Sequence, residues 1–403
     1  MDCSTPELSP SAAAVVPTVP VVFSVDSLGH RLQQLTDSRH RRGRRYPLHL
    51  VVLLIVLAKL SNQNHLSAIG DWVRNHQAQL LTALDLQWPR LPHHNTFRRL
   101  IEEVVDPVEL ESLLGQFFQE LCQASQSILV VIDGKTLRGT ISEHNPRGEH
   151  LLAAYLPEEG VVLMQVSAGQ KENEITVAPR LLGCLDLRGK VVAADAIHTQ
   201  RGLSVQILES GGDYLWLVKD NQPRLRQEIE ELFAGDRETV LGGQVPSDFR
   251  QAFSLDKGHG RLERREITVS SELKGYSDWP GLEQVFRLER RRKRCRSGKQ
   301  EREVVWGLTS LREEEASAKR LLYLCRAYWG IENGLHHRRD VTFGEDRCRL
   351  TRGRAGRVVA IVNNLVIGLL RQAGYHNLAE ARRKYQAELL PALALLTTSP
   401  LRL

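Results

Sequence analysis

The sequence predicts a mixed α/β fold in which a helical part precedes a core with parallel strands, and a β-rich segment interrupts that core. Short apolar runs bounded by Gly, Pro and Asn recur between about residues 128 and 218, as expected of strands. Helical periodicity dominates before and after them. The segment from about 222 to 311 is charged and strand-like. A chain of 403 residues has room for several such parts.

The composition is that of a soluble globular protein with a basic balance. Lys and Arg number 54 against 48 Asp and Glu, which gives a net charge of +6. This favours a polyanionic partner, and two cationic runs, residues 39–45 and 290–294, favour DNA or RNA. For each run alone, a solvated basic face is the alternative. We expect no membrane partner, because the apolar run 48–60 is too short to span a bilayer.

The six cysteines include no Cys-x-x-Cys pair. This spacing argues against a zinc module or a disulfide framework, and a reducing cytosol is the expected location. The N-terminus lacks the basic stretch that begins a signal peptide.

The N-terminal 122 residues divide into a tail and a helical domain. Residues 1–22 are rich in Ser, Ala and Pro and are predicted to be a disordered tail. Within 23–122, a buried helix opens at Pro47, an amphipathic helix covers 67–73, and Asn95 or Thr96 caps a short helix. That last helix carries Arg98 and Arg99, and the arrangement resembles a helix-turn-helix. DNA binding by this domain and a plain helical bundle are both consistent with the pattern.

Residues 123–403 are predicted to form one α/β domain with an insertion. Four core strands are expected, with a crossover helix at 201–208 between the last two. Three strands are expected within the insertion. Long helices are expected at about 313–339 and 358–370. The predicted strands are 128–132, 161–166, 190–194, 214–218, 266–270, 285–288 and 304–308.

Three carboxylates occupy positions that suggest chemistry. Asp133 and Asp195 each end an apolar run, and an α/β sheet binds ligands at the carboxyl ends of its strands. Glu332 falls on a stripe at helical spacing and is expected to point inward with its apolar members, which are Leu321, Cys325, Tyr328 and Leu335. One strand-end aspartate is more often a turn former. The set of three predicts a site for Mg²⁺ or Mn²⁺, with two ions suited to phosphoryl transfer.

Several polar residues lie near these positions in the sequence. Lys135 and Arg138 can hold a phosphate or be solvated on the surface. Past another strand end lie Lys219, Asn221 and Gln222, on the same side of the predicted sheet. His336, one turn after Glu332, can assist the metal site, contact DNA or be structural, and Arg339 can pair with a phosphate.

A series of motifs resembles the ISAs-type (H-repeat-associated) transposases of bacterial insertion sequences. The motifs occur in the family's order over about residues 30–370: Val131-Ile132-Asp133-Gly134-Lys135-Thr136-Leu137-Arg138-Gly139, Lys171-Glu172-Asn173-Glu174-Ile175, Asp195-Ala196-Ile197-His198-Thr199-Gln200, His259-Gly260-Arg261-Leu262-Glu263, Trp329-Gly330-Ile331-Glu332-Asn333 and Asp340-Val341-Thr342-Phe343-Gly344-Glu345-Asp346.

The resemblance implies a ribonuclease-H-like core with a DDE triad of Asp133, Asp195 and Glu332. It also implies metal-dependent cleavage at the ends of a mobile element and transfer of the 3′-hydroxyls into target DNA. Double-stranded DNA is the implied partner, a homodimer the implied assembly and the bacterial nucleoid the implied location. Tyr328, His337 and Arg339 depart from the family's usual residues beside the triad. Two alternatives remain, a nuclease that does not join strands and a catalytically inactive DNA-binding protein.

Overall fold

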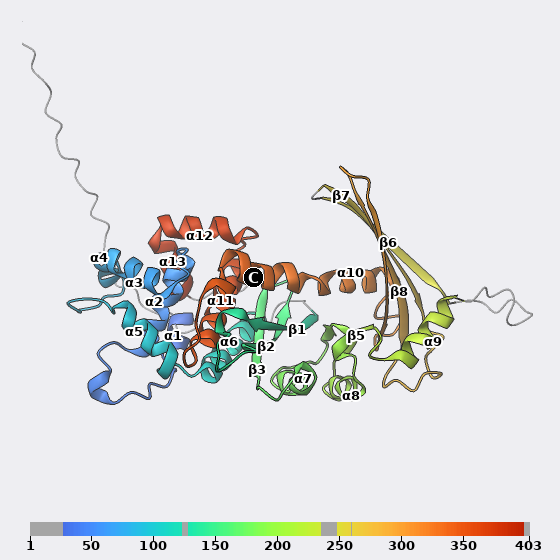
Figure 1. Cartoon of the computed structure of the whole chain (residues 1–403), viewed down its shortest axis with the longest axis horizontal. Helices are drawn as coiled ribbons and strands as arrows, with labels where there is room; N and C mark the ends of the chain where they lie inside the picture. The colour runs from blue at the N-terminus through green and yellow to red at the C-terminus, as the bar shows by residue number, and fades with distance from the viewer. Residues whose placement is uncertain (1–26, 123–127, 235–247, 259, 399–403) are drawn as a thin grey trace, which may run out of the picture.

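A computed structural model describes residues 27–122, 128–234, 248–258 and 260–398. The molecule is elongated, with a bundle of helices at one end, a sheet with helices in the middle and a group of long strands at the other end (Figure 1). The predicted disordered tail, residues 1–22, lies outside the described residues.

The N-terminal helical part (residues 27–122) contains the predicted buried helix as α2 (Leu48–Leu60). The helix α3 (Leu66–Asn75) packs against both α2 and α5 (His94–Arg99). The cap of α5 is His93 rather than Asn95 or Thr96, because its side chain accepts a hydrogen bond from the Asn95 backbone. The other helices are α1 (Leu28–Leu32), α4 (Gln77–Ala83) and α6 (Pro107–Leu121).

One nine-stranded sheet runs through the rest of the molecule, in the order β3-β2-β1-β4-β5-β9-β8-β7-β6. The strands β1, β4 and β5 are parallel, and α8 (Arg201–Glu209) crosses from β4 to β5 as predicted. The first five strands are β1 (Leu129–Leu137), β2 (Glu149–Leu156), β3 (Val161–Ala168), β4 (Val191–Ala194) and β5 (Asp213–Val218). The helix α7 (Glu174–Leu182) packs on β2 and β3.

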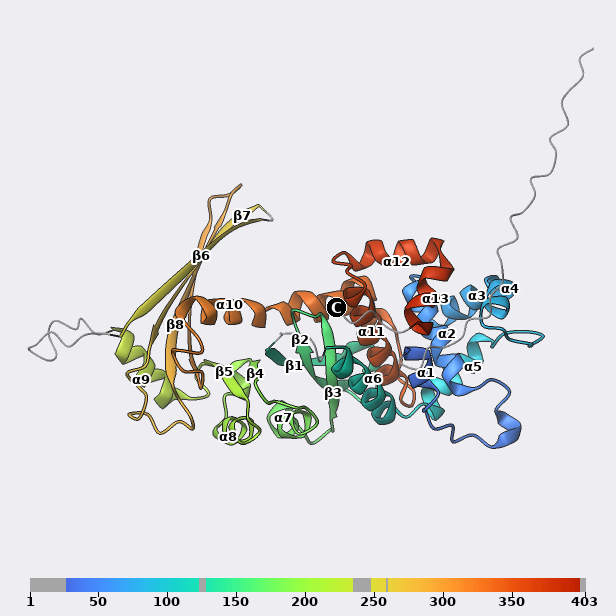
Figure 2. The same cartoon turned by 180° about the vertical axis from the view of Figure 1, so that it is seen from behind.

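The segment predicted as an insertion forms long antiparallel strands that extend the same sheet from β5 (Figure 2). They are longer than the sequence indicated, and they follow α9 (Pro223–Ala234). The strands are β6 (Arg250–Gly258), β7 (Arg261–Ser270), β8 (Gln284–Arg294) and β9 (Gln300–Thr309).

The helix predicted for 313–339 is shorter and less regular than expected. It begins at Ala318, because the Ser317 side chain accepts a hydrogen bond from the Arg320 backbone, and α10 (Ala318–Tyr328) ends at Tyr328. Two π-helical turns, Glu332–His336 and Arg338–Thr342, continue the chain. Such turns are rare and occur often at functional sites.

The C-terminal helices complete the core of the N-terminal helical part. The helix predicted for 358–370 is α11 (Ala355–Gln372), and it packs on α2, α6 and β3. Both α12 (Leu378–Ala387) and α13 (Leu389–Thr397) also contact α2. One hydrophobic cluster therefore runs from the N-terminal helices to the sheet, across the boundary expected near residue 122.

Candidate active site

Asp133 and Asp195 lie side by side, at the point where the parallel pairing of β1 with β4 ends. The ladder between β1 and β4 ends at the pair Ile132 and Ala194, and the next residues are Asp133 and Asp195. Neighbouring strands are about 4.8 Å apart, so the two side chains start from adjacent positions. The strand β1 itself continues beyond Asp133, and its antiparallel pairing with β2 extends to Leu137.

The expectation that Glu332 points inward is wrong. Its side chain is exposed, whereas Leu321, Cys325 and Leu335 of the predicted stripe are buried. The stripe fails here because α10 ends at Tyr328, and the π-helical turn that begins at Glu332 changes the angular spacing of the side chains. The carboxylate has no hydrogen-bond or ion-pair partner among the residues described, so it is open to a ligand.

The half-buried phenol of Tyr328 lies among four carboxylates. Burial raises its pKa, and the negative charges of Asp195, Asp133, Glu332 and Glu174 raise it further. All four charges act on one hydroxyl, so the four carboxylates lie on the side of the molecule where Tyr328 lies. The three predicted carboxylates and Glu174 are therefore within electrostatic range of Tyr328.

Protein groups already contact two of these carboxylates. His336 lies with Nε2 3.0 Å from Asp133 Oδ2, so this histidine, which the sequence left between metal, DNA and structural roles, supports Asp133. Lys219 Nζ lies 3.0 Å from Asp195 Oδ1 and keeps 59% of its side chain exposed. An exposed ammonium group therefore lies beside the Asp195 carboxylate.

Asn221 is exposed and Gln222 is half-buried, and the amide group of each already has a partner in the protein. Their amides donate to the backbone carbonyls of Ala196 (2.6 Å) and Thr199 (2.9 Å). These bonds support the loop that follows Asp195, and the predicted contact of the two residues with DNA stays a prediction.

The two cations after Asp133 differ in how available they are. Lys135 is only 11% exposed and lies 2.6 Å from Asp340, so its predicted phosphate contact is already taken by a carboxylate. Asp340 belongs to a π-helical turn rather than to a loop. Arg138 is 76% exposed, with Asp346 3.8 Å away, and is free to reach a ligand.

Arg339 is not a DNA contact in this structure. It is fully buried, with Nη2 2.7 Å from Glu345 Oε1, and Asn363 donates to the same carboxylate. The prediction treated Arg339 as being on the Glu332 face, but the π-helical turns rotate it into the core.

The cluster of Glu174 with two histidines was not predicted from the sequence. Its carboxylate oxygens lie 2.9 Å from His150 Nε2 and 3.1 Å from His198 Nε2. These two hydrogen bonds lower the pKa of Glu174 to about 2. A Cβ at Gly134 would overlap the Glu174 carboxylate, so only glycine next to Asp133 permits this approach.

The cluster ties together the segments that follow both aspartates. His198 ends the short helical turn after Asp195, and His150 lies on β2 and contacts Thr136 of β1 (2.9 Å). The available signal was the Lys171–Ile175 motif, yet nothing in the sequence joins Glu174 to histidines from other segments.

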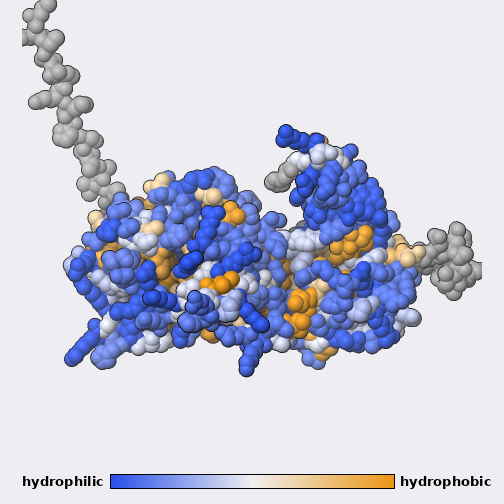
Figure 3. Space-filling model, viewed as in Figure 1, coloured by the Kyte–Doolittle hydropathy of each residue, from blue (hydrophilic) through white to orange (hydrophobic). Residues whose placement is uncertain are grey.

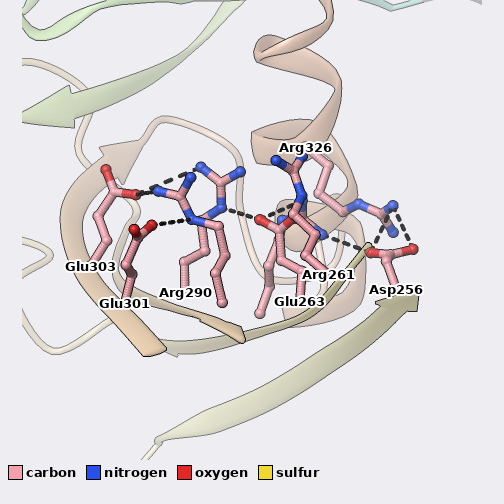
Figure 4. A network of polar contacts seen from close by, with 9 residues as sticks. Asp256, Arg261, Glu263, Arg290, Glu301, Glu303 and Arg326 are labelled. Carbon is pink, nitrogen blue, oxygen red and sulfur yellow. Dashed lines mark hydrogen bonds and ion pairs between the residues drawn. The ribbon is translucent and has the colours of Figure 1, made fainter. Parts of the chain in front are cut away.

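The second cationic run, residues 290–294, is largely neutralised by glutamates. Arg290 pairs with Glu263 and Glu303 (Figure 4). Its guanidinium carbon lies 5.3 Å from the centre of the Trp329 ring. The other three arginines of the run also have glutamate partners: Arg291 with Glu289, Arg292 with Glu303 and Arg294 with Glu301. Arg326 of α10 pairs with Asp256 of β6, which links the long strands to the helix that leads to Glu332 (Figure 4).

In the part of the chain that the structure describes, no three His, Cys, Asp or Glu side chains converge closely enough to hold a metal ion. The donor set nevertheless has the chemistry of a hard-cation site, because it consists of carboxylates on one side of the sheet.

Two family models together match most of the chain. The family model described as "Transposase DDE domain" matches residues 124–367, and the "DDE_Tnp_1-associated" model matches residues 30–118. The chain belongs to the DDE transposase family. The resemblance inferred from the motifs is thereby confirmed.

Relatives match along most of their length. "Putative transposase YncI" of Escherichia coli O157:H7 is 29% identical, over 87% of this chain and 88% of its own. "H repeat-associated putative transposase YhhI" of Escherichia coli (strain K12) is 28% identical, over 86% and 91%. Among solved structures, a piggyBac transposase synaptic complex with hairpin DNA matches 92% of this chain and 78% of its own, with 12% identity and a TM-score of 0.39. No helix in the described ranges is long and apolar enough to cross a membrane.

Proposed function

We propose that this transposase cuts DNA at the ends of its own mobile element and joins the freed 3′-hydroxyls to target DNA. Asp133, Asp195 and Glu332 would form the catalytic triad. The observation that carries the proposal is the adjacency of Asp133 and Asp195 at the end of the parallel ladder, with Glu332 near the same tyrosine.

The proposed core is ribonuclease-H-like. The sheet order β3-β2-β1-β4-β5, with two antiparallel strands followed by three parallel ones, supports this assignment. The strands β6 to β9 would then be an insertion between the second and third carboxylates, as the sequence predicts.

The three carboxylates would hold Mg²⁺ or Mn²⁺, two ions in all, because hard anionic oxygens suit these cations. Such ions would stabilise the charge that develops on the phosphate oxygens during in-line displacement. His336 would orient Asp133, and Lys219 would bind the phosphate beside Asp195. Arg138 would contact the DNA backbone. Most of the rate enhancement would come from positioning and electrostatic stabilisation.

The partner would be double-stranded DNA, both the terminal inverted repeats and the target. A homodimer would hold two ends together. The N-terminal helical part would contribute to DNA binding, and the net charge of +6 supports a polyanionic partner.

A cleavage and joining assay tests the proposal. Purified protein is incubated with Mg²⁺ and labelled duplexes that carry the repeats flanking its element, beside Asp133→Asn. We expect cleavage at the repeat end and joined products, both lost in the variant while DNA binding remains. Cleavage without joined products would instead favour a nuclease. Binding by the intact protein without cleavage in Mg²⁺ or Mn²⁺ would favour an inactive DNA-binding protein.

A further inference from the structure

A basic cleft of about 550 Å³ lies in the N-terminal helical part, far along the chain from the carboxylates. Its wall comes from the loop after residue 38, from α3 and from the segment that leads into α5. The lining includes five arginines, Arg39, Arg45, Arg74, Arg90 and Arg99, and contains no acidic residue. On the face shown in Figure 3, this end of the molecule is covered mostly by hydrophilic residues.

The cleft is built on an ordered frame. A Cβ at Gly70 would come within 2.6 Å of His94 Cβ, so α3 and α5 pack closely at this point. Tyr46 donates its hydroxyl hydrogen bond to the Arg90 carbonyl (3.1 Å), and Arg39 donates to the Tyr46 carbonyl (2.7 Å). These contacts fix the loops that carry the arginines.

Three of the five arginines have no counter-charge. Arg39 pairs with Asp37 and Arg74 with Asp71. In contrast, Arg45, Arg90 and Arg99 are exposed and have no carboxylate partner among residues 27–122, 128–234, 248–258 and 260–398. Gathered cations repel one another unless an anion lies between them. The arginines of residues 290–294 differ, because each of them pairs with a glutamate.

The chemistry of the lining favours the backbone of a duplex over a single strand. Single-stranded nucleic acid is usually bound by bases that stack on exposed aromatic rings. Among the described lining residues, Tyr46 is the only Phe, Tyr or Trp, and it is only 7% exposed. Arginines bind phosphates bidentately without reading bases.

We propose that this cleft binds the sugar-phosphate backbone of duplex DNA through Arg45, Arg90 and Arg99. The proposal rests on the proposed function, because it assumes that DNA is the substrate. Of the two adjacent arginines predicted to bind DNA, only Arg99 faces this cleft. Arg98 lines a separate cleft beside Glu102 and Arg352.

The test measures how DNA affinity depends on salt. Each phosphate contact contributes about 0.9 to the slope of log K against log salt concentration. The full chain with R45A/R90A/R99A should therefore lose up to about 2.7 of that slope on a labelled repeat duplex. R45K/R90K/R99K should keep most of it, because the charge is retained. Thermal unfolding should be unchanged for both variants, since the three side chains are exposed.

A variant with the same change in net charge, R180A/R188A/R224A, is the control. Its arginines are exposed surface groups, each paired with a carboxylate. A slope change of less than about 1 in this control is expected, because few phosphate contacts are lost. Equal loss in both triple alanine variants, or an unchanged slope in the cleft variant, would overturn the proposal.

Failure of the cleft and failure of the proposed function give different results. If the intact protein cuts and joins the duplex while the cleft variant keeps the normal slope, only the cleft assignment fails. If the slope depends on the cleft but no cleavage occurs, the cleft assignment holds and the catalytic proposal fails.

Discussion

The cluster of Glu174, His150 and His198 allows a sharp prediction from tautomers. Each histidine presents Nε2 to the Glu174 carboxylate, so each must carry its proton there. His150 Nδ1 then accepts from the Thr136 hydroxyl. His198 is fully buried, and its Nδ1 has no partner among the described residues, which also suits a proton on Nε2.

Glutamine at position 174 should therefore be tolerated far better than alanine. In Glu174→Gln, the amide oxygen still accepts a hydrogen bond from His198. The His150 ring can move its proton to Nδ1, which then donates to the Thr136 hydroxyl. His150 Nε2 is thereby free to accept a hydrogen bond from the glutamine amide N–H₂. In Glu174→Ala, buried His198 loses its partner altogether. A buried unsatisfied donor costs about 1–3 kcal/mol and a hydrogen bond to a charged group is worth about 1.5–3 kcal/mol. We expect a loss in unfolding free energy of about 3 kcal/mol for alanine and about 1 kcal/mol for glutamine.

Denaturant unfolding measures both losses, with Glu172→Ala as the control. Glu172 is two residues away and pairs with exposed Arg180, so its replacement should cost less than about 1 kcal/mol. Equal losses for Glu174→Ala and Glu174→Gln would refute the tautomer reasoning. No loss in either would refute the cluster as a support of the site.

The same cluster predicts a pH dependence. The folded pKa of Glu174 is lowered from 4.5 to about 2, so its ionic contribution is complete above about pH 4.5 and is lost as the pH falls towards 2. The upper limit of this contribution is about 3 kcal/mol, at about 1.36 kcal/mol per pKa unit. The stability difference between the wild type and Glu174→Gln should shrink across that window. A difference that stays constant from pH 5 to pH 3 would contradict the assignment.

Three further predictions concern the surroundings of the triad. Arg339→Ala should lower the unfolding free energy by about 3–5 kcal/mol, because it leaves the Glu345 carboxylate buried without its cation; a loss below about 1 kcal/mol in denaturant unfolding would restore Arg339 as a candidate ligand contact. Lys219→Ala should slow cleavage at least about tenfold. It should lower the unfolding free energy by less than about 1 kcal/mol, because the ion pair with Asp195 is half exposed. An unchanged cleavage rate would remove Lys219 from the site. Tyr328→Phe should leave the alkaline side of the cleavage pH profile unchanged, because burial and nearby carboxylates keep the phenol protonated; a shifted alkaline limb would contradict this.

The sequence predicted the position of candidate-site residues correctly where these residues directly follow an apolar strand. Asp133 and Asp195 could be found because each follows a buried strand, and parallel strands end at a common edge. The strand β2 was missed because Leu151-Leu152-Ala153-Ala154 has no alternation and favours helix as readily as strand. β6 was missed because its side chains alternate between exposed and half-buried, without an apolar face to mark it.

Errors arose where geometry departs from regular structure or depends on distant contacts. Helical phase placed Glu332 in the core and Arg339 at the site, but the π-helical turns reversed both positions. Charge counting treated residues 290–294 as a cationic surface, yet neighbouring strands supply their glutamate partners. Glu174 meets its histidines only after β2, α7 and the turn after β4 are assembled.

The most direct test of the account exchanges one carboxylate for a softer ligand. Asp195→Cys should lose cleavage of the repeat duplex in Mg²⁺, and Mn²⁺ should restore part of it, because Mn²⁺ tolerates a thiolate better than Mg²⁺ does. The wild type should cut in both ions, and Asp195→Ala should cut in neither. Cleavage by Asp195→Ala at the rate of the wild type would contradict the claim that Asp133, Asp195 and Glu332 form a metal-dependent catalytic triad.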